Sequence, residues 1–481
     1  MQPSPVLAAA LVAFFGLSPA LALPSNTDAR NVIKRDVAII GGGSAGINAA
    51  IQLKDAGKSI IVIEAQEAPG GHTHTYIDPA TGMKTDYGVA IWHNTTTVNQ
   101  YFQRFNIPLA PASIAGVSTV TVDYTTGSII NVPANQVPTQ QAVGAALQKY
   151  AAFLSKYPQL AAGMFLPRPV PQELAMPFGQ LVKQLGIDAA VPIIIQINPG
   201  LGDPLTVPVV EMARVVGLSL VQQIAASSFV TTARHYNSEL YEKAGAELAS
   251  SNSILLSSRV VASNRKQSGV ELVVKTPQGI KYICAKKLLI AIPPRLENLK
   301  EFNPTQAERS VFSKWLSTAY FTSILSNTGL PPTKQVMNVN PLRPAGQPDL
   351  PSTIFIGPNT IPGLSTAYYQ TERLSTPTAL TDDDVKARII ADIKRIQAAN
   401  RGNSSFAQTE PQFRVIKAHK PFYLQVSTED ILAGFYDQMN ALQNQLSTFY
   451  TGAAWRAHDS SMIWDYNKQI VVPMLLKSLQ N

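Results

Sequence analysis

Short apolar runs separated by glycine-rich turns mark the first strongly patterned part of the chain. Residues 37–40 are wholly apolar, as expected for a strand that is buried on both faces. A helical stretch at 47–56 follows and is stopped by Gly57. Residues 59–63 form a second apolar run, which ends on Glu64. This order predicts a parallel strand–helix–strand unit at the start of an α/β fold.

The turn between the first strand and the helix contains G-x-G-x-x-G, on Gly41, Gly43 and Gly46, with Ser44 inside it. Gly41 permits a tight turn, Gly43 lets the backbone approach a pyrophosphate, and Gly46 lets the helix pack on the strand. The helix N-terminus offers free N–H groups to phosphates. Glu64 can accept both ribose hydroxyls of an adenosine and disfavours a 2′-phosphate. We therefore predict a Rossmann-type dinucleotide fold, with these five residues at the cofactor.

A second glycine turn, Gly70-Gly71 followed by His72, comes soon after Glu64. A plain NAD dehydrogenase would continue into the next strand–helix unit instead. The pattern resembles the glutathione-reductase-type flavoproteins, in particular the amine oxidase and desaturase superfamily. The resemblance implies FAD, with Gly70, Gly71 and His72 along its diphosphate and ribityl chain. The superfamily usually has Arg where this chain has His72, so a donor is kept and a permanent charge is lost.

A middle segment fits the same superfamily. Residues 253–259, 270–276 and 281–284 are typical of short strands and lead to an apolar run at 287–292. By resemblance this is the returning part of the FAD domain, in which Val261 or the residue before it meets the adenine through its backbone.

The C-terminal segment supplies a third piece. A strand and glycine turn around Gly452 precede a helical stretch near 462–476, for which Asp459 or Ser460 is a suitable N-cap. The resemblance implies that Gly452, Ser460 and Ser461 cradle the ribityl and pyrimidine end of FAD. A helix N-terminus there would stabilise the negative charge of reduced flavin.

Particular strings narrow the resemblance further. They are GGHTHTY at 70–76, DPATG at 78–82, DYG at 86–88, FQRFNIPL at 102–109 and YTGAAW with HDSS within 450–461. Together they resemble the fungal β-cyclopiazonate dehydrogenase family. That family implies an FAD-dependent oxidoreductase of secondary metabolism, which dehydrogenates its substrate and in the named member closes a ring on a prenylated indole. The match is looser through the middle of the chain, so the substrate does not transfer.

The N-terminus predicts the compartment. Residues 6–23 are almost entirely apolar, no charge precedes Asp28, and the run ends in a small-x-small pattern. A signal peptide over 1–23 fits best, with an N-terminal membrane anchor as the alternative. No other apolar run is long enough to span, so we expect no membrane span after cleavage. Sequons at Asn94 and Asn403 could carry glycans in a secretory lumen.

Composition excludes several classes of protein. With 45% hydrophobic residues the 481-residue chain can bury a large core, and its one cysteine excludes an intramolecular disulfide or a multi-cysteine metal site. No histidine–carboxylate pattern suggests a metal. The net charge of +8 comes without a basic block, so we expect no nucleic-acid partner and a small-molecule substrate.

Flavin carries the hydride chemistry, so the protein positions the substrate C–H bond over the ring. Amine oxidases of the superfamily often place a Lys near flavin N5, but the corresponding stretch at 315–322 offers none. We therefore expect an apolar, prenyl- or arene-bearing substrate. His93, Tyr320 and Tyr369 are the candidate catalytic residues, and His93 would act as a base or as a covalent flavin tether.

Six further aromatic or histidine residues accompany these candidates. His72 is the rival for tethering the flavin. Tyr368, Phe422 and Tyr423 are candidate pocket residues. His419, like His235, is expected to be structural.

The pieces predict two interleaved domains. An FAD domain is expected over 36–107, 236–293 and 429–481, and an α+β substrate domain over 108–235 and 294–428. The leading function is dehydrogenation, with or without oxidative cyclisation, by hydride transfer to flavin N5. A flavin amine or amino-acid oxidase is the alternative, and a non-catalytic flavin-binding protein is the third class.

Overall fold

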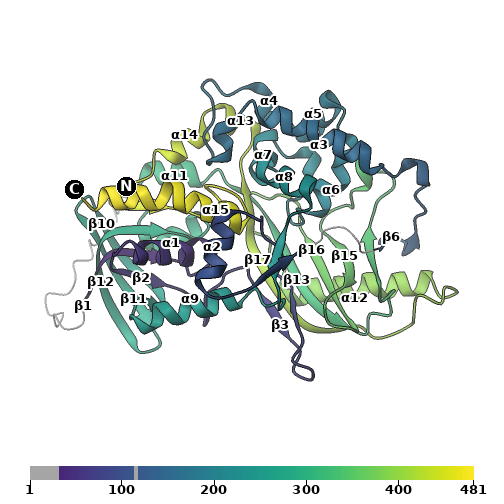
Figure 1. The fold of residues 1–481 in the computed structure, drawn as a ribbon, viewed down its shortest axis with the longest axis horizontal. Helices are drawn as coiled ribbons and strands as arrows, with labels where there is room; N and C mark the ends of the chain where they lie inside the picture. Colours follow the sequence, from purple (N-terminus) through teal and green to yellow (C-terminus); the bar gives the residue numbers. More distant parts are fainter. Residues whose placement is uncertain (1–31, 113–117, 481) are drawn as a thin grey trace, which may run out of the picture.

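The computed structural model describes residues 32–112 and 118–480, and within these residues the chain builds two seven-stranded sheets (Figure 1). The first sheet lies on the left of the view and the second on the right. The predicted leader at 1–23 is outside the described residues.

The first sheet has a parallel centre. Its order is β10-β11-β12-β1-β2-β9, with β18 also paired to β12. β1 runs parallel to both neighbours, and Val37 is in register with Lys287 of β12 and Ile60 of β2. The strands are β1 (Val32–Ile40), β2 (Ile60–Ile63), β9 (Ile254–Leu255), β10 (Arg259–Lys266), β11 (Gly269–Thr276), β12 (Gly279–Ile290) and β18 (Thr448–Tyr450). With α1 (Ser44–Asp55) crossing from β1 to β2, the Rossmann-type α/β prediction is confirmed.

The second sheet is mostly antiparallel and has the order β17-β13-β16-β15-β14-β6-β7. Its strands are β6 (Ser118–Asp123), β7 (Ser128–Ile129), β13 (Leu316–Ser326), β14 (Lys334–Asn338), β15 (Ser352–Pro358), β16 (Leu364–Gln370) and β17 (Gln412–Gln425). α12 (Asp382–Ala399) packs one apolar face against it, through Val385, Ile389, Ile393 and Ile396. The face of this sheet opposite α12 borders the cavity described below.

Helices cover the remaining surfaces. A group from α3 to α8 lies above the second sheet, and the C-terminal helices run beside α1 (Figure 1). The helices besides α1 and α12 are α2 (Thr96–Arg104), α3 (Gln140–Leu154), α4 (Gln172–Ala175), α5 (Phe178–Leu185), α6 (Val191–Gln196), α7 (Val209–Val215), α8 (Leu218–Ala226), α9 (Glu239–Ser250), α10 (Leu296–Leu299), α11 (Gln306–Phe312), α13 (Thr428–Leu432), α14 (Phe435–Asn440), α15 (Ser460–Tyr466) and α16 (Val472–Ser478). Two small strand pairs, β3 (Thr75–Ile77) with β4 (Lys84–Asp86) and β5 (Leu109–Pro111) with β8 (Val230–Thr232), complete the fold.

Among the boundaries that differ from the sequence prediction, two have a direct structural cause. β1 begins at Val32 because its first residues pair with β12, starting at Val32 opposite Tyr282. The single helix expected near 462–476 is divided into α15, a π-helical turn at Asn467–Val471, and α16. Pro473 lies in the first turn of α16 and cannot donate a backbone hydrogen bond there, which accounts for the widened turn before it.

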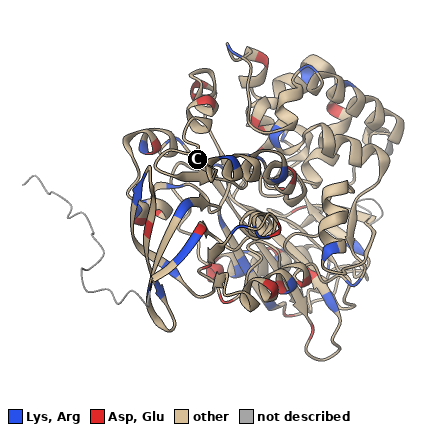
Figure 2. Cartoon of the chain, turned by 60° about the vertical axis from the view of Figure 1, so that its left-hand side comes forward, with Lys and Arg blue, Asp and Glu red and all other residues tan. Residues whose placement is uncertain are grey.

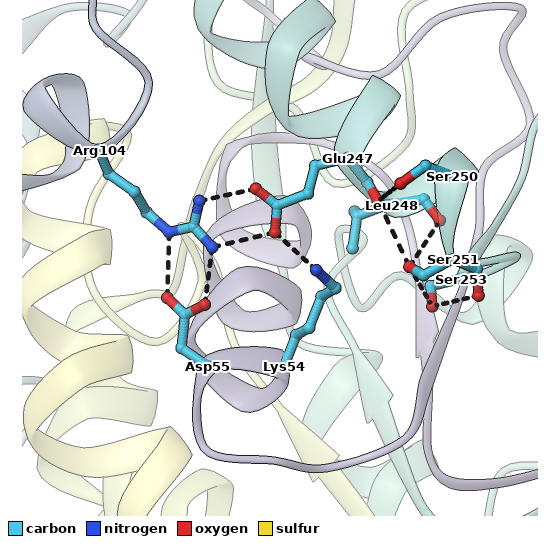
Figure 3. Close-up of polar contacts among 8 residues, drawn as sticks. All are labelled: Lys54, Asp55, Arg104, Glu247, Leu248, Ser250, Ser251 and Ser253. Carbon is cyan, nitrogen blue, oxygen red and sulfur yellow. Dashed lines mark hydrogen bonds and ion pairs between the residues drawn. The ribbon is translucent and has the colours of Figure 1, made fainter.

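One ion-pair network ties three helices together (Figure 3). Arg104 of α2 donates to both carboxylate oxygens of Asp55, at 3.1 and 2.7 Å, and to both of Glu247 in α9, at 2.6 and 3.0 Å. Lys54 adds a 2.8 Å contact to Glu247. The network therefore links α1, α2 and α9.

Charged residues are sparse along the ribbon, and both signs are interspersed (Figure 2). Between residues 259 and 290, however, seven Lys or Arg accompany one Glu, so β10–β12 hold much of the +8 surplus. Within the described ranges, no single helix has the length and apolarity to cross a membrane; α7 and α8 pass only as a pair bent by 52°.

Candidate active site

A cavity of about 580 Å3 lies between the two sheets. On one side are the carboxyl ends of β1, β2, β12 and β18, where ligands bind in parallel α/β sheets. On the other side, five strands of the second sheet each contribute a side chain, namely Tyr320, Gln335, Phe355, Tyr368 and Phe422. The cavity thus joins a dinucleotide-type edge to an aromatic wall.

The two predicted glycine turns touch one another. Gly70 donates a 2.9 Å backbone hydrogen bond to Gly42. A Cβ on Gly71 would lie 3.0 Å from the Cα of Gly43, and a Cβ on Gly46 would lie 1.9 Å from the carbonyl oxygen of Gly41. Glycine is therefore required at the contact, and the paired turns leave a smooth concave wall that a diphosphate can approach.

The N-terminus of α1 opens onto this wall. Gly43 is the N-cap and has no side chain to bond the first N–H groups. Ser44 is held at 2.9 Å from the hydroxyl of Ser460 and accepts a 2.9 Å bond from Trp464 Nε1. Uncapped N–H groups and the helix dipole suit a phosphate.

Glu64 lies at the end of β2, as the sequence predicts. Its Oε2 accepts from the Gly42 N–H at 2.5 Å and its Oε1 from the Gln66 N–H at 2.7 Å. Both oxygens are therefore oriented by the backbone and keep further lone pairs for ribose hydroxyls. The paired glycine turns, the uncapped N-terminus of α1 and the Glu64 carboxylate together fit the adenosine diphosphate part of FAD.

Most of the predicted cofactor residues line the cavity: Gly41, Gly43, Ser44, Glu64, Gly70, Gly71, His72, Gly452 and Ser460. Three do not. Gly46 packs beneath the turn, Ser461 accepts from the His93 N–H at 3.0 Å, and Val261 lies in a β-bulge of β10 with its side chain 40% exposed. A backbone contact from Val261 to adenine stays a prediction.

His93 lines the cavity but is engaged at both ring nitrogens. Nε2 lies 3.2 Å from Asp459 Oδ2, and Nδ1 lies 2.9 Å from the Ser219 hydroxyl. Burial alone would raise the pKa of Asp459, but His93 and the Met462 N–H lower it to about 2. Asp459 also caps α15. This pair therefore fixes the start of α15 against the segment before α2.

The aromatic wall corrects one predicted residue. Tyr369 does not line the cavity; its hydroxyl lies 3.2 Å from Arg388 of α12 and its ring packs in the core behind the sheet. Neighbouring residues of a strand point to opposite faces, so Tyr368 faces the cavity instead. Tyr368 packs edge-on against Tyr320, with ring centroids 5.2 Å apart. The catalytic assignment of Tyr369 is therefore wrong.

Histidines gather at one end of this wall. The His72 ring lies 4.2 Å from His419 and 6.0 Å from His458, and His74 lies 5.5 Å from His419, between ring centroids. Burial lowers the pKa of His72 and His74 from 6.5 to about 4, and holds those of His419 and His458 well below 6.5. His419 lines the cavity, and its expected structural role stays a prediction.

Several lining residues have no signal in the sequence. Asn198 follows α6, Gln335 is on β14 and Phe355 is on β15. No motif surrounds them, and only the tertiary fold brings them to the cavity. Among the described residues, no group of three or more His, Cys, Asp or Glu is placed to hold a metal ion.

The cavity lining contains no lysine or arginine in the part of the chain that the structure describes. Its carboxylates, Glu64 and Asp459, are both engaged as above. Behind the wall, Arg214 is fully buried, pairs with Glu211 at 2.9 Å and donates to the carbonyls of Leu424 and Ala454. Through these hydrogen bonds, Arg214 connects the backbones of the two cavity walls.

Comparison with known proteins identifies the family. Residues 39–105 match the NAD(P)-binding Rossmann-like domain. The chain is 41% identical to the FAD-dependent oxidoreductase oblC of Cochliobolus heterostrophus, over 94% of this chain and 93% of that one. It is 31% identical to the beta-cyclopiazonate dehydrogenase of Aspergillus oryzae, over 97% and 99% of the two chains. The chain belongs to this family of FAD-dependent oxidoreductases.

Solved structures of lower identity share the fold. A conjugated-linoleic-acid-producing fatty acid isomerase from P. acnes has a TM-score of 0.73 at 20% identity, over 91% of this chain and 98% of that one. Cyclohexylamine oxidase from Brevibacterium oxydans has a TM-score of 0.61 at 15% identity, over 93% and 99%. The protein is thus an FAD-dependent enzyme, and bound FAD supplies the two-electron chemistry.

Proposed function

We propose that this oxidoreductase dehydrogenates an apolar, prenyl- or arene-bearing secondary metabolite by hydride transfer to flavin N5, with or without ring closure. The observation that carries the proposal is the wall opposite the paired glycine turns. Tyr320, Phe355, Tyr368 and Phe422 present aromatic faces, and no lysine or arginine lies among the described lining residues. Such a wall favours stacking on planar or unsaturated carbon skeletons.

The same wall disfavours the amino-acid oxidase alternative. A free carboxylate substrate needs a cationic partner, which the described lining does not provide. A protonated amine held by an ion pair needs a free carboxylate, whereas Glu64 and Asp459 already serve the backbone and His93. The relative named beta-cyclopiazonate dehydrogenase also acts, by its name, on a cyclopiazonate.

The test is anaerobic mixing of the purified holoenzyme with two panels of compounds. One panel contains prenylated and unprenylated indoles and other arenes, including β-cyclopiazonate, and the other contains simple amines and amino acids. We expect members of the first panel alone to bleach the flavin absorbance. Bleaching by amines or amino acids with none by arenes would overturn the proposal and support the oxidase alternative.

A matched pair of variants connects the activity to the wall. Tyr368→Leu removes an aromatic face from the cavity and should raise KM for an arene substrate about tenfold, the scale of one aromatic contact. Tyr282→Leu alters a tyrosine of β12 outside the lining and should leave KM unchanged. Equal effects of the two changes would contradict the assignment.

We also propose that the enzyme enters the secretory pathway through the apolar leader at 1–23. Asn94 and Asn403 are both exposed, as acceptor asparagines must be. Expression in a fungal host, followed by N-terminal sequencing of the mature protein, should find the leader removed. Glycosidase treatment should reduce the apparent mass, and Asn403→Gln should remove part of that change. An intact leader with no glycan would overturn this proposal.

A further inference from the structure

Dehydrogenation removes a hydride and a proton from the substrate, and FAD accounts only for the hydride. The proposed function therefore needs a proton acceptor at the cavity. Of the two histidines in the predicted site, His72 and His93, His93 is less available as a proton acceptor. Its two ring nitrogens already contact Asp459 and Ser219.

The histidine array, defined here as His72, His74, His419 and His458, comes from three distant segments. His72 and His74 follow the second glycine turn, His419 is on β17, and His458 precedes α15. His72, His419 and His458 line the cavity and His74 does not. The rings contact one another in the order His458, His72, His419 and His74.

Hydrogen bonds distinguish the members of the array. His458 Nε2 accepts from the Tyr423 N–H at 3.0 Å, so its proton is on Nδ1 and it presents a donor. His419 Nε2 lies 3.4 Å from the Thr322 hydroxyl. For His72, no hydrogen bond to a ring nitrogen is formed by any described residue, although the ring lines the cavity. His72 thus keeps a lone pair available to a substrate.

We propose that His72 accepts the substrate proton. An X–H bond of the substrate breaks, where X is carbon, nitrogen or oxygen, and its electron pair stays on the substrate to form the new double bond or ring bond. His72 becomes an imidazolium, while FAD is the oxidant that takes the hydride.

The surroundings keep these imidazoles neutral before the reaction. Burial lowers the pKa of His72 to about 4, so at neutral pH the ring is unprotonated and can accept. His74 is only partly buried and packs against Tyr87, with Lys417 nearby. The other titratable or charged groups facing the array are Arg214, Tyr320 and Tyr423.

The first experiment is single-turnover flavin reduction, using the arene of the panel above that bleaches the flavin fastest. Rates are expressed per bound flavin, so that partial loss of FAD from a variant does not lower its measured rate. His72→Ala should slow reduction by about 10²- to 10⁴-fold, the scale of general-base catalysis, and added imidazole should restore part of the rate. His235→Gln, a change of an exposed histidine, is the control and should behave as wild type. A His72→Ala rate within threefold of wild type, or no rescue by imidazole, would overturn the proposal.

The second experiment does not depend on any substrate. Nitrogen-15 NMR of histidine-labelled holoenzyme reports the protonation of each ring directly, with His72→Gln giving the assignment. We expect His72 to be neutral at pH 7 and to titrate near pH 4, and His458 to be protonated on Nδ1. A His72 that is an imidazolium at pH 7 would overturn the proposal, whereas failure of every arene to bleach the flavin would count against the proposed function alone.

Discussion

Ser44 and Ser460 lie 416 residues apart in the chain, yet their hydroxyls are hydrogen-bonded at 2.9 Å. The bond joins the first turn of α1 to the start of α15 at the edge of the cavity. The head and the tail of the chain therefore meet at the predicted FAD diphosphate. Substitutions in either segment should therefore affect FAD binding more directly than substrate binding.

Gly43→Val should abolish FAD retention in a protein that still folds. The backbone at Gly43 is extended, with φ −76°, so a side chain causes no backbone strain. The nearest atom to an added Cβ is the Cα of Gly71 at 3.6 Å, which means that the side chain enters the space between the two glycine turns. Flavin content after gel filtration, with circular dichroism for folding, checks this outcome.

Gly144→Ala is the matched control for Gly43→Val. Nothing lies within 4 Å of an added Cβ there, and helix α3 favours alanine over glycine. Its flavin content should equal that of wild type. Retention of FAD by Gly43→Val would contradict the placement of the diphosphate at this turn.

Glu64→Gln should weaken FAD binding about tenfold without unfolding the chain. The amide has the shape of the carboxylate but only one acceptor oxygen, so it cannot hold the Gly42 and Gln66 N–H groups and also both ribose hydroxyls. Equilibrium dialysis against FAD measures the change. Unaltered FAD affinity would place the ribose elsewhere in the cavity.

The cofactor half of the site could be predicted from sequence because its chemistry is local. Gly41, Gly43, Gly46 and Glu64 act within one strand–helix–strand unit, and each is required by backbone geometry or by one hydrogen-bonding role. The order of the motifs along the chain then indicated which distant segments return to the first sheet, as β12 and β18 do.

The substrate half could not be predicted in this way. The histidine array assembles from segments near residues 72, 419 and 458, and no local pattern relates them. The sequence does not distinguish Tyr369 from Tyr368, because an isolated strand sequence does not reveal which face is buried by α12. A shift by one residue exchanges the faces of a strand, so the choice between Tyr368 and Tyr369 needs the sheet itself.

Arg104→Ala should lower the free energy of unfolding by about 1–2 kcal/mol, because two partly exposed bidentate ion pairs are lost. The loss should shrink in high salt, which screens such contacts. Arg104→Lys keeps the charge but not the forked geometry and should recover only part of the stability. Urea denaturation at low and high salt tests all three statements, and identical denaturation midpoints for Arg104→Ala and wild type would contradict them.

Stability should fall as the pH is lowered from 6.5 toward 4. Burial lowers the pKa of His72 and His74 to about 4 in the folded state, against 6.5 for a free histidine. Between these values the unfolded chain binds more protons than the folded chain, so the free energy of unfolding decreases as pH falls. Above pH 6.5 the stability is not reduced by these histidines. Between pH 6.5 and 4, each such histidine lowers the free energy of unfolding by up to about 1.4 kcal/mol for every unit by which the pH falls.

His74→Phe isolates one of these contributions, because it keeps an aromatic ring against Tyr87 and His419 but cannot bind a proton. Urea denaturation of the holoenzyme at several pH values between 7 and 5 should give a shallower decline for His74→Phe than for wild type. His235→Gln, at an exposed position, should decline as wild type does. Parallel curves for His74→Phe and wild type would mean that burial does not lower the pKa of His74 in the folded enzyme.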